Sequence, residues 1–174
     1  MDYFILVPDK RVANPLKITV EESILQSMEP FVVNTNDVDS LTIVDMIVSK
    51  ILFNSYFFLS DGMKNVFMMY DNEIDMVPML ITNEKFSVQL PYWLLEVKAT
   101  ENVVANKFLK SRDMLVNEAY IKDKPIHKIY YEKQTFILVN CYVAESILRR
   151  LPTGIYFQKV ETVKEGVENG SNIV

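Results

Sequence analysis

The chain of 174 residues is 49% hydrophobic and 24% charged, with a net charge of −5 at pH 7. This composition excludes an intrinsically disordered protein, and no uncharged run approaches the roughly 18 apolar residues that cross a bilayer, so we expect no membrane partner. A chain of this length buries about two-thirds of its unfolded surface. We expect one domain over residues 1–163, followed by a loosely ordered tail over residues 164–174.

The acids are concentrated in the first half of the chain. Residues 1–97 contain 14 acids and 6 bases, whereas residues 98–133 contain 5 acids and 8 bases. Phosphates would repel this acidic half, so we expect no nucleic acid partner. The acids either steer a basic protein partner toward this half or simply keep the surface soluble.

The amino end and the cysteine content predict a cytoplasmic protein. Asp2 is acidic and the first apolar run stops at Pro8, whereas a secretory signal starts with basic residues and has a longer apolar stretch. Cys141 is the only cysteine and forms no internal disulfide, in agreement with a reducing compartment.

The first 52 residues predict strands and two helices. The opening YFILV (3–7) predicts a buried strand, and KITV (17–20) and FVV (31–33) predict shorter ones. A short helix is expected over residues 20–28. Ser40 is placed to cap a longer helix over residues 40–52, because apolar residues recur there at helical spacing. These residues are Leu41, Val44, Ile47, Val48, Ile51 and Leu52.

A strand, a capped helix and a second strand then occur twice, at about 55–81 and about 135–160. In the first module YFFL (56–59) and MVPMLI (76–81) are strands, Ser60 and Asp61 supply capping oxygens, and DNEID (71–75) is the turn. In the second module FILV (136–139) and IYFQKV (155–160) are strands and Asn140 is the cap. Each helix has one apolar face. These faces are Met63, Val66, Phe67 and Tyr70 in the first helix, and Ala144, Ile147, Leu148 and Leu151 in the second.

Two further strands are expected between the modules, PYWLLEV (91–97) and HKIYYEK (127–133), while residues 101–113 are of mixed character. The sequence therefore predicts an α+β fold with a mixed, mainly antiparallel sheet and two or three amphipathic helices, built around the two modules. Duplication and convergence on one packing solution both remain open as the origin of the modules.

The residues show no convincing catalytic or metal-binding pattern. His127 and Cys141 form the one possible Cys–His nucleophile pair; the alternative is a helix-start cysteine packed as an apolar residue beside a solvent-facing histidine. Structural zinc would need about four nitrogen or sulfur ligands. Asp71, Glu73 and Asp75 have the spacing of calcium ligands, but Met76 stands where the loop needs glycine, which favours an ordinary acidic turn. We expect no catalytic residues, no metal and no cofactor.

Six aromatic residues could anchor a protein partner or complete the core. They are Tyr92, Trp93, Tyr130, Tyr131, Tyr142 and Tyr156.

The layout of these segments resembles an immunity-protein family of bacterial polymorphic toxin systems. The resemblance covers most of the chain and lies in DYFILV (2–7), LPYWLLEV (90–97), FILVN (136–140) and LPTGIYFQKV (151–160). It implies a protein that binds and neutralises a cognate toxin without a reaction of its own. Asp71, Glu73 and Asp75 are the predicted partner-binding residues, because surface turns on rigid elements carry recognition and this one concentrates charge. The alternatives are a small-molecule or peptide-binding regulatory domain with a deep apolar pocket, and an enzyme that uses Cys141.

Overall fold

The computed structural model describes residues 1–37, 41–51, 54–100, 114–131 and 134–164. These residues form two β-sheets, three α-helices and a 3-10 turn, which confirms the predicted α+β class. Most strand pairs are antiparallel, with parallel pairs only at β2–β5, β8–β11 and β7–β9 among the described residues. The tail beyond Lys164 and the segment 101–113 lie outside the described residues.

The first sheet has six strands in the order β7–β9–β10–β1–β11–β8. They are β7 (Ala99–Thr100), β9 (Ile126–Tyr131), β10 (Gln134–Asn140), β1 (Tyr3–Pro8), β11 (Ile155–Val163) and β8 (Leu115–Asn117). The second sheet has five strands in the order β2–β5–β6–β4–β3. They are β2 (Phe31–Asn34), β5 (Asp75–Asn83), β6 (Val88–Glu96), β4 (Asn54–Ser60) and β3 (Met46–Ile51).

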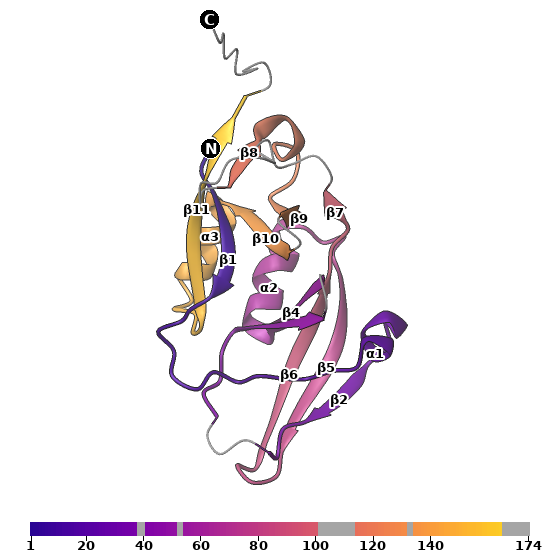
Figure 1. The fold of residues 1–174 in the computed structure, drawn as a ribbon. Helices are drawn as coiled ribbons and strands as arrows, with labels where there is room; N and C mark the ends of the chain where they lie inside the picture. The colour runs from indigo at the N-terminus through magenta and orange to yellow at the C-terminus, as the bar shows by residue number, and fades with distance from the viewer. Residues whose placement is uncertain (38–40, 52–53, 101–113, 132–133, 165–174) are drawn as a thin grey trace, which may run out of the picture.

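The helices are α1 (Glu22–Ser27), α2 (Asp61–Tyr70) and α3 (Cys141–Leu148), and the 3-10 turn η1 is Glu118–Tyr120. Figure 1 shows the sheet with β1 and β11 on one side of the molecule, the sheet with β5 and β6 on the other, and α2 between them. The helix α2 packs on β4 and β6, and α3 packs on β10 and β1. The two strand–helix–strand modules predicted from the sequence are therefore present.

The two sheets follow one plan. In the second sheet β6 lies between β4 and β5, antiparallel to both, while β3 flanks β4 and β2 runs parallel to β5. In the first sheet β1 lies between β10 and β11, antiparallel to both, while β9 flanks β10 and β8 runs parallel to β11. The first strand of the chain thus takes the place in one half that β6 takes in the other.

Two buried tyrosines mark this correspondence. Tyr3 of β1 pairs with Asn140, and Tyr92 of β6 pairs with Ser60. Each tyrosine hydroxyl donates a hydrogen bond to a backbone carbonyl, that of Ile121 for Tyr3 and that of Val44 for Tyr92. Burial raises the pKa of both phenols, so each remains a neutral hydrogen-bond donor at physiological pH.

The predicted helix caps are confirmed. The Ser60 hydroxyl accepts from the Met63 N–H at 3.4 Å, and the side-chain Oδ1 of Asn140 accepts from the Val143 N–H at 3.1 Å. These bonds satisfy backbone donors that a helix start leaves free. Asp61 does not cap α2; its carboxylate accepts from the indole Nε1 of Trp93 at 3.1 Å.

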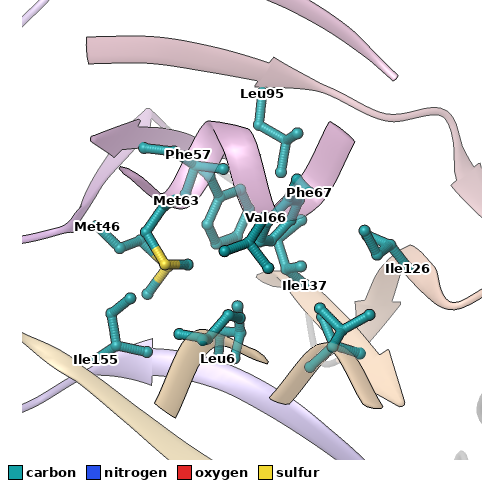
Figure 2. Packing of buried hydrophobic residues seen from close by; sticks show 14 of the residues in the cluster. Leu6, Met46, Phe57, Met63, Val66, Phe67, Leu95, Ile126, Ile137 and Ile155 are labelled. Atoms are coloured by element: carbon teal, nitrogen blue, oxygen red, sulfur yellow. The ribbon is translucent and has the colours of Figure 1, made fainter. Parts of the chain in front are cut away.

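The central core lies between the sheets and includes the buried faces of α2 and α3 (Figure 2). Val66 and Phe67 of α2 are fully buried there, together with Ile137 of β10 and Leu95 of β6. Two further clusters cover the outer faces of the sheets. One packs residues 16–25 against the second sheet, and the other packs residues 114–121 against the first.

The predicted helix over residues 40–52 is wrong, because the described part of it contains the strand β3. Met46 of β3 faces the central core, whereas its neighbour Ile47 faces the outer cluster of the second sheet. Both faces of this strand are therefore apolar, which removes the alternation of a half-buried strand and imitates helical spacing. Ser40 lies outside the described residues.

Two smaller predictions are also wrong. KITV (17–20) forms no strand, although Ile18 and Val20 are buried. Leu148 and Leu151 do not belong to the buried face of α3, since they are 51% and 87% exposed. The short helix α1 and the strands β1, β2, β6 and β9 lie where the sequence predicted them.

Candidate functional site

An open groove of 530 Å³ lies where the α2–β5 turn meets β7 and the segment that precedes β9. Its walls come from the first module and from residues 96–127, which lie between the two modules in the chain. The described residues that line it include five carboxylates and two lysines, beside the rings of Tyr120 and His127. The charged residues are Asp71, Glu73, Asp75, Glu96, Asp123, Lys98 and Lys124. We call this feature the acidic groove.

The α2–β5 turn places the three acids predicted from the sequence on one wall of the acidic groove. The Asp71 N–H donates to the Phe67 carbonyl at 3.0 Å and ends α2, and the Asp71 carboxylate accepts from the Glu73 N–H at 3.1 Å. Ile74 is buried in the central core and anchors the turn. Glu73 and Asp75 are exposed. Their carboxylates are thus held at the surface by a turn with fixed ends.

The other acids of the acidic groove come from distant parts of the chain. Glu96 ends β6 and lies directly opposite Asp75 in the β5–β6 ladder. Like charges in this position destabilise a sheet. Burial raises the pKa of Glu96, and Asp75 raises it further, while Lys128 lowers it. The fold therefore keeps a repulsive pair at this wall, as binding sites often do at some cost in stability.

His127 supports the floor of the acidic groove and is 3% exposed, which corrects the expected solvent-facing histidine. Its Nε2 lies 3.0 Å from the Ile121 carbonyl oxygen and 2.9 Å from that of Lys124. Two acceptors require a proton on Nε2, so Nδ1 accepts from the Thr100 hydroxyl at 3.1 Å. Burial lowers the pKa of the imidazole, which favours this neutral form.

The corresponding corner of the other module is closed. There the turn between α3 and β11 packs on the segment before β3, and an added Cβ on Gly154 would lie 2.6 Å from Cγ1 of Val44. The Asp45 carboxylate accepts from the Thr153 N–H at 2.7 Å and from the Ser60 hydroxyl at 2.6 Å. The Asp45 N–H donates to the Thr153 carbonyl at 2.8 Å.

A proline explains why only one corner closes. The Ser60 N–H donates to the Asp45 carbonyl, and in the other module the equivalent Asn140 N–H donates to the Pro125 carbonyl. Pro125 is therefore the structural equivalent of Asp45. Proline has neither a carboxylate nor a backbone N–H to hold the facing turn. Lys124 takes the place of Val44, the residue before Asp45. Counted back from Met79 and Val160, which pair with the equivalent tyrosines Tyr92 and Tyr3, Glu73 takes the place of Gly154. Charged side chains therefore occupy the positions that pack tightly in the closed corner.

The described hydrogen bonds of His127 do not include Cys141, so they show no Cys–His pair. Both ring nitrogens bond to Thr100 and to backbone carbonyls. Cys141 is a partly exposed free thiol in the first turn of α3, and its N–H donates to the Asp2 carbonyl. Within the described residues no three His, Cys, Asp or Glu side chains are grouped so as to hold a metal ion.

The aromatic candidates are divided between the core and the surface. Tyr92 is buried, whereas Tyr130, Tyr142 and Tyr156 are about half exposed. Trp93 is fixed on α2 by its hydrogen bond to Asp61 and by the Lys64 ammonium, which lies 3.7 Å from the ring centroid. None of these six lines the acidic groove; its aromatic residue, Tyr120, had no distinguishing pattern in the sequence.

Comparison with known proteins adds no family and no relative. No family model matches the chain, and a search of curated proteins gives no significant match. None of the described helices is long and apolar enough to cross a membrane.

Proposed function

We propose that this protein binds and neutralises a protein toxin produced by the same cell, and that the acidic groove receives a basic segment of that toxin. The supporting observation is the difference between the two corners of the fold. One corner is closed by Gly154 against Val44, and the other is open and lined by five carboxylates. The two similar halves form a rigid framework around the one open, charged corner, which suits this corner to bind a partner.

The charges of the acidic groove favour a lysine- or arginine-bearing partner. Exposed carboxylates at Glu73 and Asp75 attract such a partner over several ångströms, and the low-dielectric walls concentrate the field. A bound cation would stabilise the carboxylate of the half-buried Glu96 most, because it would offset both the cost of burying that charge and the repulsion from Asp75. Binding of this kind blocks the toxin sterically and needs no chemistry in this chain.

The resemblance to immunity proteins supplies the kind of partner, and the groove supplies its charge. An ordinary small-molecule site is concave and mostly apolar. The acidic groove is open and bears charges on both walls, so a protein segment suits it better than an apolar ligand.

A growth-protection assay tests this proposal. The candidate toxin is the protein encoded by the gene beside this one, expressed in a sensitive bacterium with and without the chain. We expect the wild-type chain to restore growth and a variant with Asp71→Lys, Glu73→Lys and Asp75→Lys to protect poorly. A matched control reverses three exposed acids elsewhere, Glu21→Lys, Glu29→Lys and Glu84→Lys, and should protect fully. Equal protection by both variants would remove the acidic groove from the mechanism.

A further inference from the structure

A second pocket opens where β4 and β6 separate. The ladder between these strands ends at Phe58 opposite Leu94, although β4 begins at Asn54 and β6 continues to Glu96. Over this stretch each strand keeps its other neighbour, β3 for β4 and β5 for β6. A pocket of 370 Å³ lies beside the separated strands, and we call it the split-sheet pocket. Its lining includes Leu25, Met28, Ser55, Glu96, Lys128 and Thr135.

Two buried hydroxyl groups line the split-sheet pocket with protons to donate. Ser55 is 4% exposed and Thr135 is 7% exposed. The Ser55 N–H donates to Thr135 Oγ1 at 3.3 Å, but neither hydroxyl donates a hydrogen bond to any of the described residues. No fully enclosed side-chain oxygen in the described ranges lacks a partner, so the Ser55 hydroxyl is open to the pocket that it lines. A bound acceptor would pair with both hydroxyls.

Charges of opposite sign face the split-sheet pocket without forming an ion pair. Lys128 and Glu96 both line it and are both partly buried. Burial raises the pKa of Glu96 and the charge of Lys128 lowers it, so the two groups are close enough to interact. No salt bridge joins them in the part of the chain that the structure describes. A ligand with one cation and one anion would give each of these side chains a direct partner.

The end of α1 forms an apolar wall of the split-sheet pocket. Leu25 is 1% exposed, and Met28 is 42% exposed directly after the helix. The φ of Met28 is 57°, in the left-handed region where a helix end usually has glycine. Methionine is flexible and polarizable, so it adapts to apolar groups of different shape. The pocket thus combines two hydroxyl donors, one charge of each sign and an adaptable apolar wall.

We propose that the split-sheet pocket binds a free α-amino acid with an aliphatic side chain. The ligand carboxylate would accept from the Ser55 and Thr135 hydroxyls and from the Lys128 ammonium. The ligand ammonium would pair with Glu96, and the aliphatic group would lie on the apolar wall. A pocket of this volume accommodates a small molecule. An uncharged apolar ligand would leave both charges without partners, and a simple anion would be repelled by Glu96. This inference is independent of the proposed toxin binding.

Isothermal titration calorimetry of the purified chain with L-leucine and L-methionine tests this proposal without any toxin. We expect saturable binding with a Kd of about 1 mM or tighter. Leucinamide lacks the carboxylate and 4-methylpentanoate lacks the ammonium, so each should bind about 10-fold more weakly than L-leucine or worse. No binding of either amino acid at millimolar concentration would overturn the proposal. So would equal binding of L-leucine and either analogue.

Two substitutions test the location of the site. Lys128→Met should weaken L-leucine binding about 10-fold or more, whereas Lys10→Met, at an exposed lysine outside the pocket, should not change it. Ser55→Ala removes a hydroxyl that donates no described hydrogen bond, so it should weaken binding about 2- to 10-fold without lowering the urea midpoint. Neither Lys128 nor Ser55 lines the acidic groove, so failure here would leave toxin binding untouched. Unchanged L-leucine affinity in both variants would contradict the proposed site.

Discussion

Gly154 lies so close to Val44 that any side chain at residue 154 would collide with it. A Cβ added to Gly154 would lie 2.6 Å from Cγ1 of Val44, and the φ of Gly154 is 79°. Two hydrogen bonds between Asp45 and Thr153 hold the same corner. This contact closes one half of the fold at the position where the other half has the acidic groove.

Gly154→Ala should lower the free energy of unfolding by about 2–4 kcal/mol, because it combines a left-handed backbone with overpacking. Gly62→Ala is the control. A Cβ added to Gly62 in α2 would lie 3.9 Å from Ser60 Oγ, an ordinary contact, so alanine there should stabilise the protein by about 0.5–1 kcal/mol. Urea denaturation of the two variants measures both effects, and an equal response would contradict the tight contact at Gly154.

His127 should make stability depend on pH. Burial lowers its pKa in the folded state, so the folded chain prefers the neutral ring more than the unfolded chain does. This contribution is complete above the ordinary histidine pKa and is lost as the pH falls through the folded-state value. We therefore expect the urea concentration at the unfolding midpoint to decrease as the pH is lowered from about 7 to about 5.5.

His127→Gln provides the comparison for that experiment. Glutamine cannot reproduce both ring contacts, so the variant should lose about 1–3 kcal/mol at neutral pH by leaving a buried carbonyl unsatisfied. Its midpoint should change less with pH over the same range. A wild-type midpoint that rises on acidification would show that the charged ring is preferred in the fold.

Glu96→Gln should stabilise the protein at neutral pH by about 0.2–1 kcal/mol, because it removes a like-charge cross-strand pair with Asp75. The pKa of Glu96 is raised in the folded state, so the ionised form opposes folding and the gain from glutamine should disappear as acid protonates the native residue. The same substitution should weaken binding of a basic toxin. Glu84→Gln, an exposed acid outside the acidic groove, serves as the control for both measurements.

Moving β1 to the other end of the chain should preserve the fold. β1 fills in the first sheet the place of β6, and Tyr3 pairs with Val160 near the end of β11. A circular permutant with residues 1–9 placed after residue 174 keeps every strand pair, and longer connections change loop entropy by only about 0.6 kcal/mol per doubling. A cooperative unfolding transition close to that of the parent is expected. A permutant without such a transition would mean that β1 depends on its link to residue 10.

Much of the fold could be predicted because local signals agreed with the final structure. Ser60 and Asn140 cap helices whose buried faces follow helical spacing, and each strand of the two modules is locally apolar. β3 could not be predicted in this way, since cores on both of its faces remove alternation. The equivalence of β1 and β6 could not be predicted from the sequence either. β6 follows the strand–helix–strand module of its half along the chain, whereas β1 precedes the module of its half.

The candidate site was predicted only in part. The acidic turn 71–75 has a local signature, and it lines the acidic groove. Glu96, Asp123 and Lys124 reach the same groove through pairing of distant segments, which no local pattern encodes. Pro125 takes the place of Asp45, and this substitution is recognised only when the two halves of the fold are compared.

The rate constant for association with the candidate toxin of the growth-protection assay tests the central claim most directly. Stopped-flow mixing should show that Asp71→Lys, Glu73→Lys and Asp75→Lys together slow association by about 10-fold or more at low salt, the range expected when electrostatic steering is lost. The control reversals at Glu21, Glu29 and Glu84 change net charge equally and should slow it far less. Equal slowing by both sets would mean that overall charge, and not the acidic groove, guides the partner.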